Sequence, residues 1–250
     1  MTGEASPYRR RVEAEADFHD ARTRTDNGAR MSYAYKSVND VYDFGRVPAQ
    51  CLDRSVLEVG CFTGDQASRL HAFTGRYRGV DISASAIDHC NARGLGPNYS
   101  FAVDDANRFD TIGDASIDYA FGQGVLHHLD LERFGPALAR KLAPGGFARF
   151  VEPAQGNLLL RTFRRLTPRL RTADEHPFDQ ASMDVLARSF DVHVTYHALL
   201  RPYLPMLFLN HPAVTRASRW LDGHLLKVAL LQRQAWLLQI ELRDRRPAKA

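Results

Sequence analysis

The chain has 250 residues, 44% of them hydrophobic and 25% charged, which is an ordinary composition for a globular protein. The length suffices for one sizeable α/β domain with additions or for two small domains. The formal net charge is +4, and because the acidic residues are spread among the basic ones, the charge pattern does not indicate a nucleic-acid partner.

The cysteine content and the lengths of the apolar runs indicate the cellular compartment of the protein. Cys51, Cys61 and Cys90 are scattered without a Cys-x-x-Cys spacing, which favours a reducing cytoplasm over a disulfide framework or a zinc site. The first twenty residues have no apolar core, so we expect no signal peptide. The longest apolar runs, such as LPMLFL at 204–209, are too short to span a bilayer. We therefore predict a cytoplasmic protein, and the sequence leaves a monomer and a homodimer open.

Short apolar segments alternate with helix-like segments along most of the chain. Residues 1–50 are charged and then aromatic. The predicted strands cover 56–59, 77–80, 99–103, 117–121, 147–151, 191–197 and 235–243, and the predicted helices cover 66–73, 85–93, 131–142 and 182–189. This alternation predicts an α/β fold with a parallel sheet and helices on both of its faces. The last two strands suit an antiparallel pair at the edge of the sheet.

Two segments interrupt this alternation. An arginine-rich insertion occupies 154–178, and Arg161, Arg164 and Arg165 fall on one helical face, where they either clamp an acidic substrate or form a solvated surface. Residues 201–232 are apolar and basic with helical spacing. The predicted division is an N-terminal helical arm or lid (1–50), a core with the insertion (51–200), a helical lid (201–232), and a final strand with a tail (233–250).

A glycine turn follows the first predicted strand in SVLEVGCFTGDQASRL, residues 55–70. Ligands of doubly wound sheets bind at the carboxyl ends of the strands, and Gly60 and Gly64 would let a ligand approach the backbone there. The following helix offers free N–H groups. Asp81 ends the second strand, where its carboxylate could accept both hydroxyls of a ribose. These features predict a ligand that contains a nucleoside.

The glycine spacing argues against a dinucleotide. The G-x-G-x-x-G pattern would fall on Gly60, Phe62 and Asp65, so it fails twice and leaves no pyrophosphate-binding glycines. Glu58 stands where it could face a cationic or amino-bearing group, and the two acids after the third strand could bind an adenine amino group. A nucleoside with an amino-acid tail and no phosphate fits these parts, which predicts S-adenosylmethionine (SAM) as the cofactor.

Five motifs resemble, in order and spacing, those of the class I SAM-dependent methyltransferases. They are VLEVGCFTG, GVDIS, VDDAN, SIDYAFGQGVLHHLD and LAPGGFARFVEP, and together they cover roughly Ser55 to Pro153. The resemblance is to the small-molecule group that includes ubiquinone- and menaquinone-biosynthesis enzymes. It implies a Rossmann-like doubly wound sheet of seven strands with an antiparallel edge strand. The family's first motif has a third glycine where this chain has Phe62, whose ring we expect beside the cofactor or under a substrate lid.

The resemblance also implies the cofactor-binding residues, which surround the ends of the first four strands. They are Glu58, Gly60, Cys61, Phe62, Gly64, Asp81, Ile82, Asp104, Asp105, Ala106, Gly122 and Gln123. At the adenine edge we favour Asp105 with Ala106, and Asp104 is the alternate.

Candidate catalytic residues follow the fourth and fifth strands. His127, His128 or Glu152 could act as a general base, and because neighbouring helical residues do not share a face, we expect only one histidine to point at the ligand. The other histidine would then cap or pack against the next helix. Glu152 with Asp174, Glu175 and His176 could recognise the acceptor, hold a divalent metal or pair with the insertion's arginines. We assign no metal ligand, and the predicted substrate contacts are Tyr33, Tyr35, His176 and Arg161.

These features predict in-line transfer of a methyl group from SAM to a small-molecule acceptor. We expect a hydroxyl of an apolar or aromatic specialised metabolite, covered by the two helical lids. Methylation of nitrogen or carbon is an alternative. An RNA methyltransferase is a second, although the fourth strand is not followed by an Asn/Asp-Pro-Pro-aromatic loop and the chain has no Pro-Cys nucleophile. A non-catalytic SAM-binding module is a third, suggested by Phe62.

Overall fold

The described part of the chain forms one seven-stranded sheet. The computed structural model describes residues 7–24, 47–70, 73–154, 156–158, 161–162, 165, 178–204, 208 and 211–246. The strands are β1 (Ser55–Val59), β2 (Arg76–Asp81), β3 (Tyr99–Val103), β4 (Ile117–Gln123), β5 (Leu142–Pro153), β6 (Phe190–His197) and β7 (Leu237–Asp244). Their order is β3-β2-β1-β4-β5-β7-β6.

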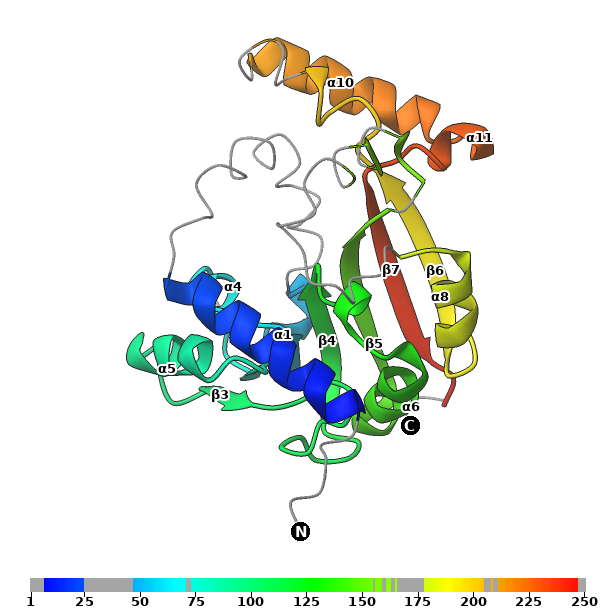
Figure 1. The fold of residues 1–250 in the computed structure, drawn as a ribbon. Coiled ribbons are helices and arrows are strands. Elements are labelled where there is room, and N and C mark those ends of the chain that lie inside the picture. Colours follow the sequence, from blue (N-terminus) through cyan, green and yellow to red (C-terminus); the bar gives the residue numbers. More distant parts are fainter. Residues whose placement is uncertain are drawn as a thin grey trace.

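The sheet is parallel except where β7 enters it. β1 to β5 pair in parallel, whereas β7 runs antiparallel to both of its neighbours, β5 and β6. The strands β6 and β7 therefore form the expected antiparallel pair at one end of the sheet, with β7 inside and β6 outermost (Figure 1). This arrangement confirms the predicted α/β fold, and it brings the carboxyl ends of β1 to β5 to one edge.

Helices flank the sheet and extend beyond it. They are α1 (Pro7–Arg24), α4 (Asp65–Ser68), α5 (Ala84–Ala92), α6 (Leu131–Lys141), α8 (Gln180–Leu186), α10 (Pro212–Leu225) and α11 (Ala229–Gln232), with the 3-10 turns η1 (Ala49–Cys51) and η2 (Leu126–His128). Figure 1 shows α10 and α11 projecting past the ends of β6 and β7. No helix in the described ranges is long and apolar enough to cross a membrane.

Two predicted helices differ from the observed ones. The helix expected over 66–73 is shorter, because Phe73 turns inward instead and meets the ring of Tyr77 edge-on, with 5.9 Å between the ring centroids. The helical segment expected over 201–232 is divided, since α10 begins only at Pro212, a residue preorganised for the first helical position. The predicted boundaries of arm, core and lids stay a prediction.

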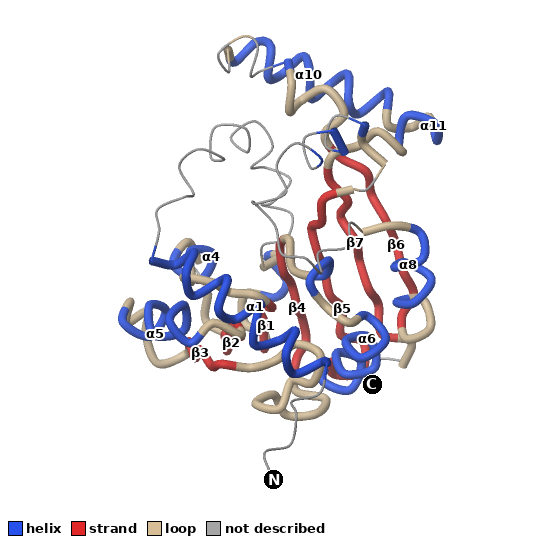
Figure 2. Tube along the Cα trace, in the orientation of Figure 1, coloured by secondary structure: helices blue, strands red, loops and turns tan. Residues whose placement is uncertain are grey.

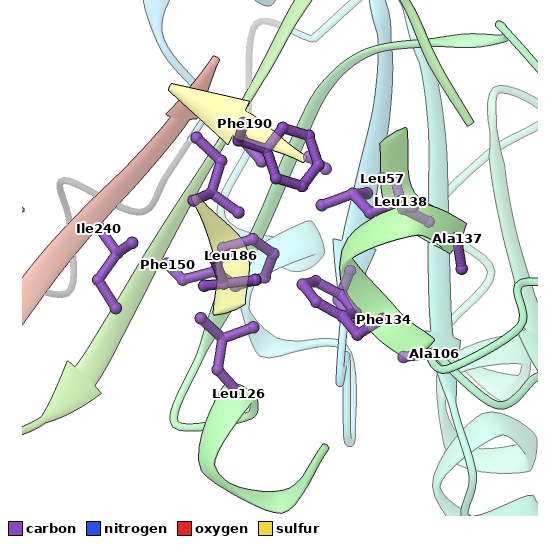
Figure 3. Close-up of a cluster of buried hydrophobic side chains, with 14 of the residues drawn as sticks. Leu57, Ala106, Leu126, Phe134, Ala137, Leu138, Phe150, Leu186, Phe190 and Ile240 are labelled. Carbon is purple, nitrogen blue, oxygen red and sulfur yellow. The ribbon is translucent and has the colours of Figure 1, made fainter. Parts of the chain in front are cut away.

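Apolar side chains cover both faces of the sheet. One cluster packs Leu57 and Phe150 against Phe134 and Leu138 of α6 and against Leu186 of α8 (Figure 3). The opposite face carries an aromatic cluster of Val56, Phe73, Tyr77, Tyr119 and Phe121. Burial on both faces is typical of parallel strands and explains why they read as continuous apolar runs. It also makes the strands a rigid support for the loops at their carboxyl ends.

Candidate active site

A pocket of about 270 Å³ opens at the carboxyl ends of β1 to β4, and residues of α1 contribute to its wall. Figure 2 shows α1 passing in front of β1 and β4. Eight of the twelve predicted cofactor residues line the pocket, namely Gly60, Phe62, Asp81, Ile82, Asp104, Asp105, Ala106 and Gln123. The other four, Glu58, Cys61, Gly64 and Gly122, are absent from its wall.

Backbone N–H groups of the glycine turn and of the loop after β2 donate hydrogen bonds to the Asp81 carboxylate. Gly60 and Gly64 have φ angles of 72° and 75°, which suit glycine, and Phe62 also has a positive φ of 43°. The Phe62 N–H donates to one carboxylate oxygen of Asp81 at 2.9 Å, and the Ser83 N–H donates to the other at 2.9 Å. These two donors hold the Asp81 carboxylate at the pocket wall, and Phe62 lines the pocket beside it.

Glu58 was expected to face the ligand, but it does not line the pocket. Alternation along β1 directs its side chain onto a face of the sheet, where the carboxylate accepts a hydrogen bond from the Tyr77 hydroxyl. Burial, with smaller contributions from the nearby Cys90, Asp81 and Asp65, raises the pKa of Glu58 to about 8, although the hydrogen bond from Tyr77 lowers it. The carboxyl is therefore a buried, largely protonated group under the glycine turn.

The other three residues outside the pocket wall contribute to packing around the glycine turn and β4. Cys61 packs against Ile87 and Cys90, and Gly64 precedes the first residue of α4. At Gly122 a Cβ atom would lie 2.7 Å from the Val59 carbonyl oxygen. The absent side chain at this position lets β1 and β4 pack closely.

Asp104 and Asp105 have different environments although they are neighbours. The Asp104 carboxylate accepts hydrogen bonds from the N–H groups of Asp110 and Thr111, at 3.0 and 2.8 Å, so it stabilises its own loop. The Asp105 carboxylate accepts a 2.9 Å bond from the Asn107 N–H and a bond from the Tyr8 hydroxyl of α1. Asp105 therefore lies at the boundary between pocket and α1, next to the buried Ala106.

Of the three candidate bases, only His128 lines the pocket. Glu152 is fully buried, and its carboxylate accepts bonds from the N–H groups of Val125 and Leu126 at 2.9 and 2.8 Å. It also lies 2.6 Å from Nδ1 of His127. Backbone and imidazole groups enclose the Glu152 carboxylate, which contacts His127 and does not line the pocket.

The two neighbouring histidines lie close together, but only His128 lines the pocket. Their ring centroids lie 4.1 Å apart with an interplanar angle of 39°. Both belong to the 3-10 turn η2. His127 is held from within by Glu152, and His128 faces the pocket.

Most predicted substrate contacts lie outside the described residues. These are Tyr33, Tyr35 and His176, together with Asp174, Glu175 and Arg164. Arg161 is described, is exposed and does not line the pocket. Within the described ranges no group of three or more His, Cys, Asp or Glu side chains could hold a metal ion.

The sequence analysis expected an N-terminal helical arm or lid over 1–50, but it named no residue of α1 as part of the site. Tyr8, Val12 and Glu15 line the pocket, and their spacing of four and three residues places them on one helical face. That spacing is visible in the sequence. However, it does not reveal which surface the face would cover.

The pocket wall is strongly acidic. Its described residues include five carboxylates, Glu15, Asp81, Asp104, Asp105 and Asp130, one histidine, and no Lys or Arg. Asp65, the first residue of α4, lies outside this wall and pairs with the Arg93 guanidinium at 2.5 Å. The charge distribution of the wall attracts a cationic ligand and repels a pyrophosphate.

Residues 56–146 match the family model described as a methyltransferase domain. The matched segment runs from β1 into β5 and includes the glycine turn, Asp81 and both histidines of η2. The match supports an enzyme, and the pocket lies within the matched segment except for the part supplied by α1.

Solved structures resemble the whole described fold at low sequence identity. Phosphoethanolamine N-methyltransferase 2 of Haemonchus contortus, solved with phosphomonomethylethanolamine and S-adenosylhomocysteine, is 16% identical with a TM-score of 0.61, over 93% of this chain and 60% of that one. The chain therefore spans about 60% of that protein's length.

Two further structures carry the same cofactor product. The N-methyltransferase NodS of Bradyrhizobium japonicum, with S-adenosylhomocysteine, is 15% identical with a TM-score of 0.56, over 92% of this chain and 98% of that one. Geranyl diphosphate C-methyltransferase of Streptomyces coelicolor, solved with Mg²⁺, geranyl diphosphate and S-adenosylhomocysteine, is 16% identical with a TM-score of 0.56, over 97% and 86%. At these identities the likeness establishes the fold that surrounds the methyltransferase domain.

Proposed function

We propose that this chain transfers a methyl group from SAM to a small-molecule acceptor. The observation that carries the proposal is the acidic pocket over the glycine turn, with Asp81 at its wall and no Lys or Arg among its described residues. A sulfonium cation with an amino group suits this wall. A dinucleotide does not, because Asp65 occupies the place where a pyrophosphate would approach α4.

In this proposal, different pocket residues contact different parts of SAM. Asp81 accepts the ribose hydroxyls, Asp105 and Ala106 border the adenine, and Gln123 with the turn at Phe62 borders the methionine tail. When bound, SAM supplies an electrophilic methyl group. The chain's own contribution is then to align the acceptor and exclude water, and such alignment is worth roughly 7–11 kcal/mol of barrier.

A hydroxyl acceptor must also lose a proton, and His128 is the group that suits this task. Its imidazole lines the pocket, and general-base catalysis typically contributes about 10²–10⁴ in rate. This supports O-methylation of an apolar or aromatic specialised metabolite as the preferred reaction. N- or C-methylation of a small molecule is the alternative, and the acidic wall disfavours RNA. The cytoplasmic location and a monomeric or homodimeric state stay part of the proposal.

The proposal is tested first by binding. Calorimetry with S-adenosylhomocysteine should show one site, and Asp81→Asn should weaken it, because the amide keeps one acceptor oxygen and loses the other. A hydrogen bond to a charged group contributes about 1.5–3 kcal/mol, so the expected loss is roughly 10- to 150-fold. Asp88→Asn, an exposed acid on α5, is the matched control and should bind as the wild type does. Unchanged affinity in Asp81→Asn, with an unchanged melting temperature, would exclude the ribose assignment.

The reaction is tested by a radiolabelled-methyl screen. Pools of hydroxylated aromatics, amines and RNA are incubated with labelled SAM and the wild-type chain. Label in the hydroxyl pool supports O-methylation. Label confined to the amine pool would support N-methylation instead, and label confined to RNA would support an RNA methyltransferase. Cofactor binding without transfer to any pool would favour the non-catalytic module.

A further inference from the structure

The helix α1 is attached to the pocket at both of its ends. Near its start, the Tyr8 hydroxyl donates to Asp105, and the Arg133 guanidinium lies 4.4 Å above the Tyr8 ring. Near its end, the Asp20 carboxylate accepts a 2.8 Å hydrogen bond from the Ser85 hydroxyl and another from the Ser83 hydroxyl. These contacts attach α1 to the loops that follow β3 and β2, so that its middle crosses the pocket.

The middle of α1 supplies a buried carboxylate to His128. Glu15 is only 5% exposed, and its Oε1 lies 3.3 Å from Nδ1 of His128. An ionised carboxylate can only accept, so the imidazole must carry its proton on Nδ1 in this contact. The neutral ring then keeps the lone pair on Nε2, the form that a general base requires.

The contact to His128 parallels the one to His127 but comes from a different part of the chain. Glu152 holds His127 through a 2.6 Å contact from within the sheet, where two backbone N–H groups fix the carboxylate. Glu15 belongs to a separate helix that reaches the site only by docking. Each of the two neighbouring histidines therefore contacts a carboxylate: the Glu152 carboxylate belongs to the sheet, and the Glu15 carboxylate depends on the position of α1.

We propose that Glu15 is a positioning residue that sets the tautomer of His128, so that docking of α1 completes the general base. This inference rests on the proposed function. In the proton-transfer step, Nε2 of His128 takes the proton of the acceptor hydroxyl, and the electron pair of the broken O–H bond stays on the oxygen, which becomes the nucleophile. The Glu15 carboxylate then faces the imidazolium that results, and stabilises it.

The tautomer is measured directly by ¹⁵N NMR of histidine-labelled protein at alkaline pH, without any acceptor. His128→Gln assigns the signal. The wild type should show His128 protonated on Nδ1. Glu15→Ala should shift the ring predominantly to the Nε2-protonated form, whereas Glu15→Gln, whose amide oxygen can still accept from Nδ1, should retain much of the wild-type pattern. Asp17→Asn removes one negative charge from an exposed position of α1 and should change nothing.

Kinetics provide the second readout once the acceptor is known. Glu15→Ala should lower kcat on the order of 10²-fold, the lower end of general-base effects, with the acceptor KM nearly unchanged. An Nδ1-protonated His128 in Glu15→Ala overturns the proposal, and so does an equal response to Asp17→Asn. Failure of the wild type to bind S-adenosylhomocysteine would instead defeat the proposed function, and the NMR result is read independently of it.

Discussion

The buried carboxyl of Glu58 should give the free energy of unfolding a defined dependence on pH. Burial raises its pKa in the folded chain to about 8, compared with 4.5 for the ordinary group. Because the folded state holds the proton more tightly, the stabilising contribution is complete below about pH 4.5 and is lost as the pH rises toward 8. Each pKa unit corresponds to about 1.4 kcal/mol, so the loss between pH 5 and pH 8 amounts to about 4 kcal/mol.

The variant Glu58→Gln isolates this contribution, since the amide stays neutral at every pH and can still accept from the Tyr77 hydroxyl. Urea unfolding of both proteins at pH 5, 6, 7 and 8 gives their free energies of unfolding. The wild type should lose stability relative to Glu58→Gln by about 4 kcal/mol across this range. Asp88→Asn, which removes an exposed acid, should follow the wild type. Parallel pH profiles for the wild type and Glu58→Gln would refute the reasoning.

The remaining predictions concern packing and the attachment of α10. Gly122→Ala should destabilise the chain by about 1–3 kcal/mol, because the new methyl group would clash with the Val59 carbonyl oxygen. Gly223→Ala in α10 should stabilise the chain by about 0.4–1 kcal/mol, because the space around the new Cβ atom is open. The melting temperatures of the two variants measure the difference. Asp222→Ala should cost about 3–5 kcal/mol, since the buried carboxylate accepts from the N–H groups of Leu199 and Leu200 and lies 3.7 Å from the Arg201 guanidinium. Hydrogen exchange should accelerate at Leu199 and Leu200, and unchanged exchange there would contradict this.

The strands could be predicted because their signal is local. The apolar runs that end at Val59, Asp81 and Val103 lie within one or two residues of the observed β1, β2 and β3. The motif spacing likewise brought Gly60 and Asp81 to one edge of the sheet, since parallel strands place their carboxyl ends together. These features need no knowledge of distant contacts.

Long-range packing decided what the local signal left open. Phe73 was expected to extend the helix after the glycine turn, but α4 ends at Ser68, and the centroid of the Phe73 ring lies 5.8 Å from that of the Tyr99 ring in β3. Glu152 was expected at the ligand, but two backbone N–H groups and His127 enclose its carboxylate. In each case the partner lies beyond the reach of periodicity.

The sequence by itself therefore determined the alternation of strands and helices, the glycine turn and the acid that ends β2, because these depend on neighbours a few residues apart. Only the tertiary structure decided which face of α1 lines the pocket, that Glu15 reaches His128 and that Glu58 is buried. Glu15 and His128 are separated by 113 residues, and a contact of that kind forms only when two independently specified surfaces dock.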